Sequence, residues 1–570
     1  MSRFEKQGQS KVINSYGAVG TLIQTMNNGS LMIDNFDKWP YYRHLVNQYN
    51  RNNQFVIDSP ALIKEDRLLE RLKVVLNCNT LQGIFRMPSN EFHHQNGVKD
   101  LPKVISANLF PRYFFCPRCH QMNYYVADGQ FPFCCRLPQE QFSFVLVSEK
   151  GLISDVPWAR FLISDPAVNV IHFNDDDTKA TNLNLKYTTG GSAEHLEAKK
   201  VTGNIYGQNV TRSLASLPIK TFIDSRNVSY KMAIRQGNNL CFVKTLSSIY
   251  IPEYQIPVYE KAELLSTKRV MDRLGSPLSA TILLEYLRVT FPDTRTNLDH
   301  IQYWLQEQES GVIVDDSEYK FKEFDFITSK ETYENPSEEI SFSKFEINKW
   351  GIINLFKIKK IKVTHVQTGY TRLKPEGDIQ LIYSNPNILF YPGVELKGEG
   401  ILLQMNTSTL NAYLNNRAFG LLDSDIYSMI HSLSHCIMKE LEFECGYPLN
   451  SLKERLYYGT EEIGGIDQVK YAGILIYSAS GSNSSFGGIA ALFETLNDEL
   501  KISALIKNAY ERAQDCPNDP ICISEESNGN KGVCYSCNLI PEISCEFFNE
   551  SLNRVALNDF YQNYCNDGVE

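Results

Sequence analysis

Five cysteines near the end of the chain constrain its folding more than any other feature. Their spacing is Cys516-x5-Cys522-x11-Cys534-x2-Cys537-x7-Cys545. A C-x-x-C turn directs two thiolates at one zinc ion about 2.3 Å away, and a second pair completes a tetrahedron. Because four thiolates leave no open coordination position, we expect a structural zinc site. Such a site supplies folding free energy to a stretch with few apolar residues to bury.

The spacing leaves open which four cysteines bind the ion. Cys534 and Cys537 form the closest pair, and Cys516 with Cys522 completes the set unless Cys545 replaces one of them. A redox C-x-x-C or a group of buried thiols is the alternative. A redox motif requires a strand before it and a helix after it, whereas the polar segment ESNGNKG precedes the C-x-x-C pair. The pattern therefore favours zinc.

A second group of cysteines lies in the first third of the chain. Its members are Cys116, Cys119, Cys134 and Cys135. The C-x-x-C pair is typical of a zinc ribbon, but two adjacent cysteines are awkward joint ligands of one ion. The alternatives are a second zinc site and a degenerate ribbon with free thiols. His120 or His172 could supply a missing ligand, and the spacing selects neither.

Composition and charge limit the functional class. The sequence has 14 cysteines and a net charge of −10, begins with the polar segment MSRFEKQGQSKVINSYG, and has no apolar run near the ~18 residues that span a bilayer. We therefore expect a cytoplasmic protein with reduced thiols and no membrane contact, which favours metal binding over disulfides. The acidic balance argues against a dedicated duplex-DNA binder and restricts nucleic-acid contact to a local patch or a shared surface.

The chain is long enough for several domains, with 570 residues that are 43% hydrophobic. Mixed helical and strand patterns predict an α+β, multidomain fold with zinc-stapled, loop-rich modules. We expect four consecutive segments. They are an α/β region over 1–110, a cysteine-containing, degenerate zinc-ribbon-like module over 111–200, a mainly helical region over 201–345, and a zinc-binding domain over 346–570.

The segment DSDIYSMIHSLSHCIMKELEFECGY predicts a helix over 423–445, capped by Asp423 or Asp425 and ended by Gly446. His431 and His435 lie one turn apart in it, as in the H-E-x-x-H motif of metalloproteases. However, Ser432 replaces the general base, so we expect no catalysis. The helical angle places both histidines opposite the apolar stripe, where we expect either a plain polar face or a hydrogen-bonding or interface role. The apolar stripe consists of Ile426, Met429, Ile430, Leu433 and Ile437.

A basic stretch is the candidate nucleic-acid contact. Its residues are Lys357, Lys359, Lys360, Lys362, Arg372 and Lys374. Basic residues interleaved with aromatic ones suit single-stranded nucleic acid, which is bound by charge and stacking. The alternative is an edge strand that its lysines protect from aggregation.

A glycine- and serine-rich loop, SASGSNSSFGG, precedes a predicted helix and could hold a phosphate at the helix N-terminus. No Gly-Lys dipeptide occurs in the chain, which excludes a Walker motif. The alternative is that the glycines only serve the turn. Glu395 and Glu399 lie in PGVELKGEGI, where we expect them to orient glycine turns rather than to act as paired carboxylates.

Several motifs in order give the chain a family resemblance. They include FPRYFFCPRCHQM, KGLISDVPW, GYTRLKP, ELKGEGILL, GILIYSASGSNSSFGGI and VCYSCNLIPEISCEFFNESLNR. Together they resemble the DrmB family, the non-helicase component of the DISARM anti-phage defence system. The last third is similar to MrfA-like zinc-binding domains, which also occur fused to superfamily 2 helicases. The resemblance implies that all five C-terminal cysteines occupy positions where the family has cysteines.

The first cysteine group departs from this family pattern. DrmB-like chains often carry Cys and His in the segment that reads SEKGLISDVPW here, where this chain has Ser148 and Leu152. Neither side chain is a zinc ligand, so the resemblance does not establish that the first group binds metal.

The resemblance implies a non-catalytic zinc-binding subunit that partners a DrmA-type superfamily 2 helicase and helps bind single-stranded or end-containing phage DNA. The alternative from the residues is a metal-dependent nuclease or hydrolase whose carboxylates are brought together by the fold. A scaffold with no DNA contact is a third hypothesis.

Overall fold

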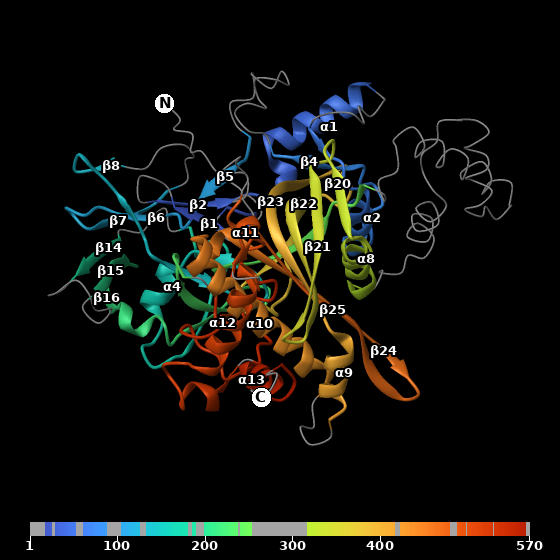
Figure 1. Ribbon diagram of the computed structural model, residues 1–570. Coiled ribbons are helices and arrows are strands. Elements are labelled where there is room, and N and C mark those ends of the chain that lie inside the picture. The colour runs from blue at the N-terminus through green and yellow to red at the C-terminus, as the bar shows by residue number, and fades with distance from the viewer. Residues whose placement is uncertain are drawn as a thin grey trace. The chain divides into compact units, whose positions relative to one another are not determined.

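The computed structural model divides the chain into two compact units. The first unit comprises residues 1–63, 80–246 and 365–394, and the second comprises residues 64–79, 247–364 and 395–570. Each unit is therefore assembled from segments far apart in the sequence, unlike the four consecutive segments expected above (Figure 1). The residues described are 17–24, 29–52, 61–87, 104–125, 133–179, 185–189, 199–237, 240–252, 316–416, 422–478, 487–496, 499–527 and 529–565.

Short strands in three sheets make up most of the first unit. The sheet orders are β1-β2-β5, β10-β6-β7-β14-β15-β16 and β12-β11-β18-β17-β13. The strands are β1 (Leu22–Gln24), β2 (Ser30–Ile33), β5 (Ala107–Leu109), β6 (Tyr113–Phe115), β7 (Gln121–Tyr124), β10 (Glu140–Gln141), β11 (Phe144–Val147), β12 (Ile153–Ser154), β13 (Val170–His172), β14 (Leu185–Thr189), β15 (Lys199–Ile205), β16 (Gln208–Ser213), β17 (Thr221–Ile223) and β18 (Ser229–Ile234).

Aromatic side chains hold the centre of this unit together. Trp158, at the start of α4 (Trp158–Ile163), is fully buried and meets Phe142 edge to face at 4.8 Å. Such edge-to-face pairs add to the stabilisation that comes from burial alone. The unit also contains α1 (Pro40–Asn52), the hairpin of β8 (Phe133–Cys134) and β9 (Leu137–Pro138), and β3 (Leu62–Ile63) paired with β4 (Gly83–Arg86).

The second unit is built on a long antiparallel sheet with the order β20-β21-β22-β23-β25-β24. The strands are β20 (Thr332–Asn335), β21 (Ile340–Lys349), β22 (Ile352–Thr371), β23 (Phe390–Met405), β24 (Leu452–Ile463) and β25 (Ile466–Ser478), of which residues 365–371 of β22 and 390–394 of β23 are assigned to the first unit. The helices are α2 (Asp66–Val75), α8 (Asp316–Thr328), α9 (Thr407–Leu414), α10 (Asp423–Cys445), α11 (Gly488–Ala491), α12 (Lys501–Gln514) and α13 (Arg554–Phe560).

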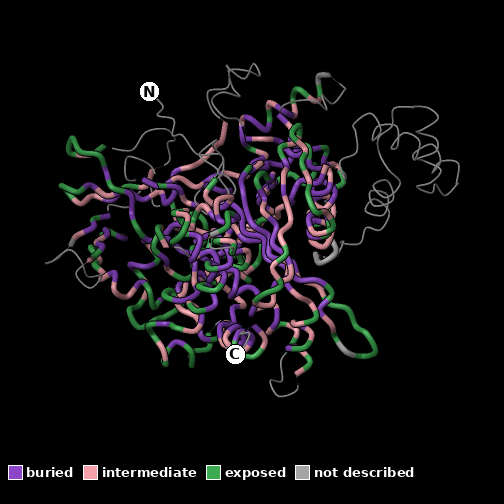
Figure 2. The backbone as a smooth tube through the Cα atoms, in the orientation of Figure 1, coloured by how far each residue is buried: buried purple, intermediate pink, exposed green. Residues whose placement is uncertain are grey.

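Apolar side chains of β25 point alternately to the two faces of the sheet, and each face carries a hydrophobic core. Ala472, Ile474 and Ile476 pack with α10 and α12, whereas Leu475 and Tyr477 pack on the other face with α8. Successive strand residues point to opposite faces, so a strand buried on both sides reads as a continuous apolar run. Figure 1 shows α10, α12 and α13 close together over the first of these faces. In Figure 2 the burial ends at the β24–β25 hairpin tip, where residues 460–465 are exposed.

The helix predicted over 423–445 is confirmed, and its environment differs from the expectation. α10 ends at Gly446 in the left-handed conformation (φ 70°), and Asp425 accepts a hydrogen bond from the Leu422 amide at 3.0 Å, as a helix start requires. However, His431 and His435 are both fully buried. The expectation of a plain polar face was wrong because the C-terminal tail covers the face of α10 opposite the apolar stripe. The alternative of a hydrogen-bonding role agrees with the structure, since both rings contact backbone carbonyls of the tail.

Other expectations need correction in the described residues. The segment 201–345 was expected to be mainly helical, but residues 199–249 include strands β15 to β19 (Phe242–Ile249), and residues 332–345 contain β20 and the first part of β21. Residues 253–315 of this segment lie outside the described residues. The helix expected after the glycine–serine loop is interrupted, because β26 (Thr495–Leu496) and β27 (Glu499–Leu500) separate α11 from α12. Among the described helices, none is long and apolar enough to cross a membrane.

The glycines of KGEG lie inside β23 and form no turn, which corrects the expectation above. A Cβ atom on Gly398 would lie 1.9 Å from the carbonyl oxygen of Ser478 in β25. Such a contact is impossible without moving the backbone. Glycine is therefore required here because two strands of the central sheet approach closely.

Gly398→Ala should force β23 and β25 apart and lower the free energy of unfolding by about 1–3 kcal/mol, the usual range for overpacking. The measurement is urea denaturation followed by circular dichroism. Lys397→Ala, at the exposed neighbouring position, is the control and should change stability little. An unchanged midpoint for Gly398→Ala would contradict the close approach.

Candidate metal centre

Four of the five C-terminal cysteines converge in the tail of the second unit. They are Cys516, Cys522, Cys534 and Cys537, whose sulfur atoms all lie within 4.8 Å of one another. The Sγ–Sγ distances are 3.6 Å for Cys516–Cys534, 3.9 Å for Cys522–Cys537 and 3.8 Å for Cys534–Cys537. A tetrahedral zinc ion with sulfur atoms at about 2.3 Å requires them to be about 3.8 Å apart. This tail tetrad therefore has the dimensions of a four-thiolate zinc site.

Turns and a short helix position the four sulfur atoms. Cys516 follows α12, and Cys522 begins the 3-10 helix Cys522–Ser524. Asp519 closes the turn between them by accepting a hydrogen bond from the Ile523 amide at 3.0 Å. The Cys534 amide donates to the Cys537 sulfur at 3.3 Å, which is typical of a C-x-x-C metal loop. The Asn518 side chain also donates to the Cys534 sulfur, at 3.4 Å.

Arg554, which the sequence patterns did not single out, joins the tetrad loops to α13. Its guanidinium is fully buried and donates to both carboxylate oxygens of Asp519, at 2.6 and 3.0 Å. It also donates to the backbone carbonyls of Ala513 and Gly532. Four thiolates around Zn²⁺ carry a net charge of −2, so a buried arginine beside them offsets part of the excess. The ion pair holds the pKa of Asp519 below its usual value.

Cys545, the fifth cysteine of the predicted set, lies outside the tail tetrad. Its sulfur is 3.2 Å from Nε2 of His431, and it groups with His431, His435 and Glu454. The alternative in which Cys545 replaces Cys516 or Cys522 is therefore not the arrangement in the structure. Sequence reasoning missed Glu454 because nothing in the strand sequence LKERLYY distinguishes it from a solvent-facing carboxylate.

The first cysteine group also comes together. Cys116, Cys119, Cys134 and Cys135 have their sulfur atoms within 4.8 Å of one another, at the β6–β7 turn and the β8–β9 hairpin. Cys135 and Arg136 both have positive φ values, 52° and 65°, which lets two adjacent cysteines turn toward the same point. Neither His120 nor His172 belongs to this group in the described residues.

The six basic residues do not form one surface. Arg372 is buried, and its guanidinium donates to the carbonyls of Gly20, Gly151 and Leu240, so it cannot bind a phosphate. The prediction that Arg372 contacts nucleic acid was therefore wrong. Lys374 is exposed and pairs with Glu149 at 3.3 Å.

The other four basic residues lie on β22 around a β-bulge. Ser341 pairs with Lys360 and Phe342 with Ile358, which leaves Lys359 as the extra residue. The bulge shifts the alternation, so Phe356, Ile358, Ile361 and Val363 share one core while the lysines point away from it. β22 lies between β21 and β23, which rules out the edge-strand alternative.

The lysine stripe, Lys357, Lys359, Lys360 and Lys362, differs in exposure along its length. Lys359 and Lys360 are exposed. Lys362 is held by Glu338 at 3.3 Å and lies over the ring of Tyr250 at 4.1 Å. The interleaved Phe356 is fully buried, so it cannot stack on a base. The stripe offers charge without the aromatic platform that was expected.

The glycine–serine loop leads to a helix start that is already occupied. The Glu399 carboxylate accepts hydrogen bonds from the amides of Gly487, Ile489 and Ala490 at 2.9–3.3 Å, and from the Tyr447 hydroxyl. A buried carboxylate that fills the N-terminus of α11 takes the place a phosphate would need. The phosphate-binding interpretation of this end of the loop is therefore wrong, while residues 479–486 lie outside the described residues.

The comparisons with known proteins agree with these features. Residues 433–538 match the MrfA Zn-binding domain, a range that contains the whole tail tetrad and ends before Cys545. Residues 8–223 match a domain of unknown function, DUF8724. A curated relative, DISARM protein DrmB of Bacillus paralicheniformis, is 29% identical over 237 residues. That match covers 36% of this chain and 40% of the relative. These findings support the resemblance to DrmB.

Cys534→Ser should remove one zinc ion per chain and unfold the tail loops, because three thiolates hold zinc much less tightly than four. Zinc content by plasma mass spectrometry and protease sensitivity of the C-terminal tail are the two readouts. Cys445→Ser is the control, since that cysteine belongs to neither cysteine group. A variant with full zinc content and an unchanged melting curve would rule out the tail tetrad as a zinc site.

Proposed function

Starting from the resemblance to DrmB, we propose that this protein is a zinc-binding, non-catalytic subunit of a DISARM-type anti-phage defence complex. The observation that carries the proposal is the joint match to DISARM protein DrmB and to the MrfA Zn-binding domain. Its partner in this proposal is a DrmA-type superfamily 2 helicase, and the complex acts on single-stranded or end-containing phage DNA in the cytoplasm.

The zinc sites are given a structural role. A four-thiolate site has no open position for water or substrate, so the ion orders the loops around it and performs no reaction. In our proposal the tail tetrad, fastened to α13 through Arg554, forms part of the surface that recognises the helicase. Without the zinc ion, the loops of the tail tetrad would have too few apolar contacts to hold this surface in one conformation.

DNA contact is assigned to the exposed half of the lysine stripe. Lys359 and Lys360 are exposed at the β22 bulge, whereas Lys362 is partly neutralised by Glu338. Two free ammonium groups on an acidic protein give weak binding on their own. We therefore expect this patch to extend a DNA path that the helicase supplies, rather than to bind DNA alone.

Lys359→Glu with Lys360→Glu should weaken single-stranded DNA binding by the purified complex. The loss of two phosphate contacts should also reduce the slope of log K against log salt concentration by about 1.4, from about 0.7 per contact. Fluorescence anisotropy at several salt concentrations measures both quantities. Lys470→Glu with Lys507→Glu is the charge-matched control at two other exposed positions. If the two double variants bound single-stranded DNA with equal affinity, the proposal that the lysine stripe contacts DNA would be wrong.

Co-expression with a tagged DrmA-type helicase tests the partnership itself. The two proteins should co-purify and remain together on size exclusion, while the purified chain alone should hydrolyse neither ATP nor DNA with magnesium or manganese. Failure to co-purify would count against the proposed assembly. DNA cleavage by the chain alone, abolished by one carboxylate substitution, would establish the nuclease alternative.

A further inference from the structure

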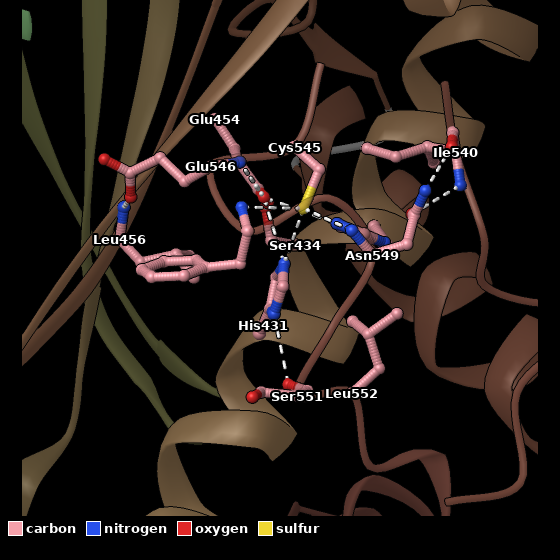
Figure 3. Close-up of polar contacts among 12 residues, drawn as sticks. His431, Ser434, Glu454, Leu456, Ile540, Cys545, Glu546, Asn549, Ser551 and Leu552 are labelled. Carbon is pink, nitrogen blue, oxygen red and sulfur yellow. Dashed lines mark hydrogen bonds and ion pairs between the residues drawn. The ribbon is translucent and has the colours of Figure 1, made fainter. Parts of the chain in front are cut away.

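A second group of metal-binding side chains lies inside the second unit, apart from the tail tetrad. Figure 3 shows His431 on α10, Glu454 and Cys545 side by side. His435 lies one turn further along α10, Glu454 belongs to β24, and Cys545 belongs to the C-terminal tail. Both histidines are fully buried, and Glu454 and Cys545 are 3% and 8% exposed. The polar atoms of four separate side chains thus meet in the protein interior, where each would lose its hydration without a strong partner.

The nitrogen, oxygen and sulfur atoms that could bind a metal are spaced as ligands of one ion. Nε2 of His431 lies 3.1 Å from Oε1 of Glu454 and 3.2 Å from the Cys545 sulfur, and Nε2 of His435 lies 3.3 Å from the same oxygen. All four donor atoms are within 4.8 Å of one another. Zinc bound to nitrogen and oxygen at about 2.0–2.1 Å and to sulfur at about 2.3 Å places neighbouring donors about 3.3–3.6 Å apart.

The hydrogen bond that Nδ1 of each histidine makes determines that Nε2 faces the other three side chains. Nδ1 of His431 is 3.1 Å from the Ser551 carbonyl, and Nδ1 of His435 is 3.1 Å from the Asn538 carbonyl. A carbonyl only accepts hydrogen bonds, so both Nδ1 atoms carry the proton. In a neutral ring, Nε2 then presents a lone pair to the centre. This is the arrangement by which backbone carbonyls orient metal-binding histidines.

The oxygen and sulfur atoms are also arranged as acceptors. Oε1 of Glu454 accepts a hydrogen bond from the Glu546 amide at 3.1 Å, and Oε2 accepts one from the Ser434 hydroxyl at 2.6 Å. The Cys545 sulfur accepts from the amides of Phe547 and Asn549, both at 3.2 Å. Four acceptor atoms therefore point at one another. Such an arrangement is stable with a cation at its centre, or with further protons on the imidazole, thiol or carboxyl groups.

The charge of the four groups also suits a divalent ion. Two imidazolium rings with centroids only 4.5 Å apart would repel each other in a buried site. Lys453, the neighbour of Glu454 in β24, directs its ammonium group to the Ile543 carbonyl. A divalent ion would be balanced by one carboxylate and one thiolate, which gives the buried group no net charge.

We propose that His431, His435, Glu454 and Cys545 bind a structural zinc ion, separate from the ion of the tail tetrad. Mixed nitrogen, oxygen and sulfur ligands in a tetrahedral arrangement suit zinc. All four positions are filled by the protein and the site is closed to solvent, so the ion has no substrate position. It ties α10, β24 and the tail together at one point.

Metal analysis of the purified full-length protein tests this site independently of any defence function. Cys545→Ser and His435→Asn should each lower the zinc content by one ion per chain while the tail tetrad keeps its own. Cys545→His should restore it, because imidazole replaces thiolate as a ligand. Cys565→Ser, at a buried cysteine outside the three groups, is the control and should keep full zinc content.

X-ray absorption at the zinc edge keeps the test valid if a variant fails to fold. The wild-type protein should show a nitrogen or oxygen shell at about 2.0–2.1 Å beside the sulfur shell at about 2.3 Å. The shell at the shorter distance should weaken in His435→Asn. A shell of sulfur alone, an unchanged zinc content in folded Cys545→Ser, or a stoichiometric metal other than zinc would each overturn the proposal.

Discussion

The packing of the C-terminal tail against α10 is the interaction on which the second unit depends. Ile540, Leu557 and Phe560 of the tail enter the apolar core around α10, and hydrogen bonds fix the loops between them. Asn538 donates to the Ser432 carbonyl at 2.9 Å, and the Asn553 amide donates to the Ser432 hydroxyl at 2.7 Å. Polar groups buried in this way are stable only when each finds a partner, which makes the tail specific for this one face of the helix. Asn538 directly follows Cys537 of the tail tetrad, and its carbonyl is 3.1 Å from Nδ1 of His435, so both candidate metal groups of the second unit adjoin this contact.

The sequence predicted what depends on local spacing. The C-x-x-C turns, the span of α10 and its glycine end follow from rules that act over a few residues, and the structure agrees with each. The tail tetrad followed from the same spacing, although spacing alone left Cys545 as a competing member. The grouping of His431 with Cys545 joins positions 114 residues apart, and no local pattern signals it.

The wrong predictions for the α10 histidines and for Arg372 share one physical cause. A helical angle separates polar from apolar positions, but it does not show that a tail will cover the polar side. A plain polar face was therefore one expectation for His431 and His435, beside a hydrogen-bonding or interface role. The prediction for Arg372 in the first unit failed for the same reason. Its guanidinium donates to three backbone carbonyls, and the sequence alone does not distinguish such an arginine from one that binds a phosphate. In the lysine stripe, the single extra residue at the β22 bulge shifts the alternation, so lysines that the sequence spacing would place on opposite faces lie on one side.

The position of the tail in the chain has a consequence for biosynthesis. α10 leaves the ribosome about a hundred residues before Cys545, so its histidines face an unfinished protein while the intervening strands are made. The side of α10 that carries His431 and His435 is therefore covered only after Cys545 and the segment around it have been synthesised.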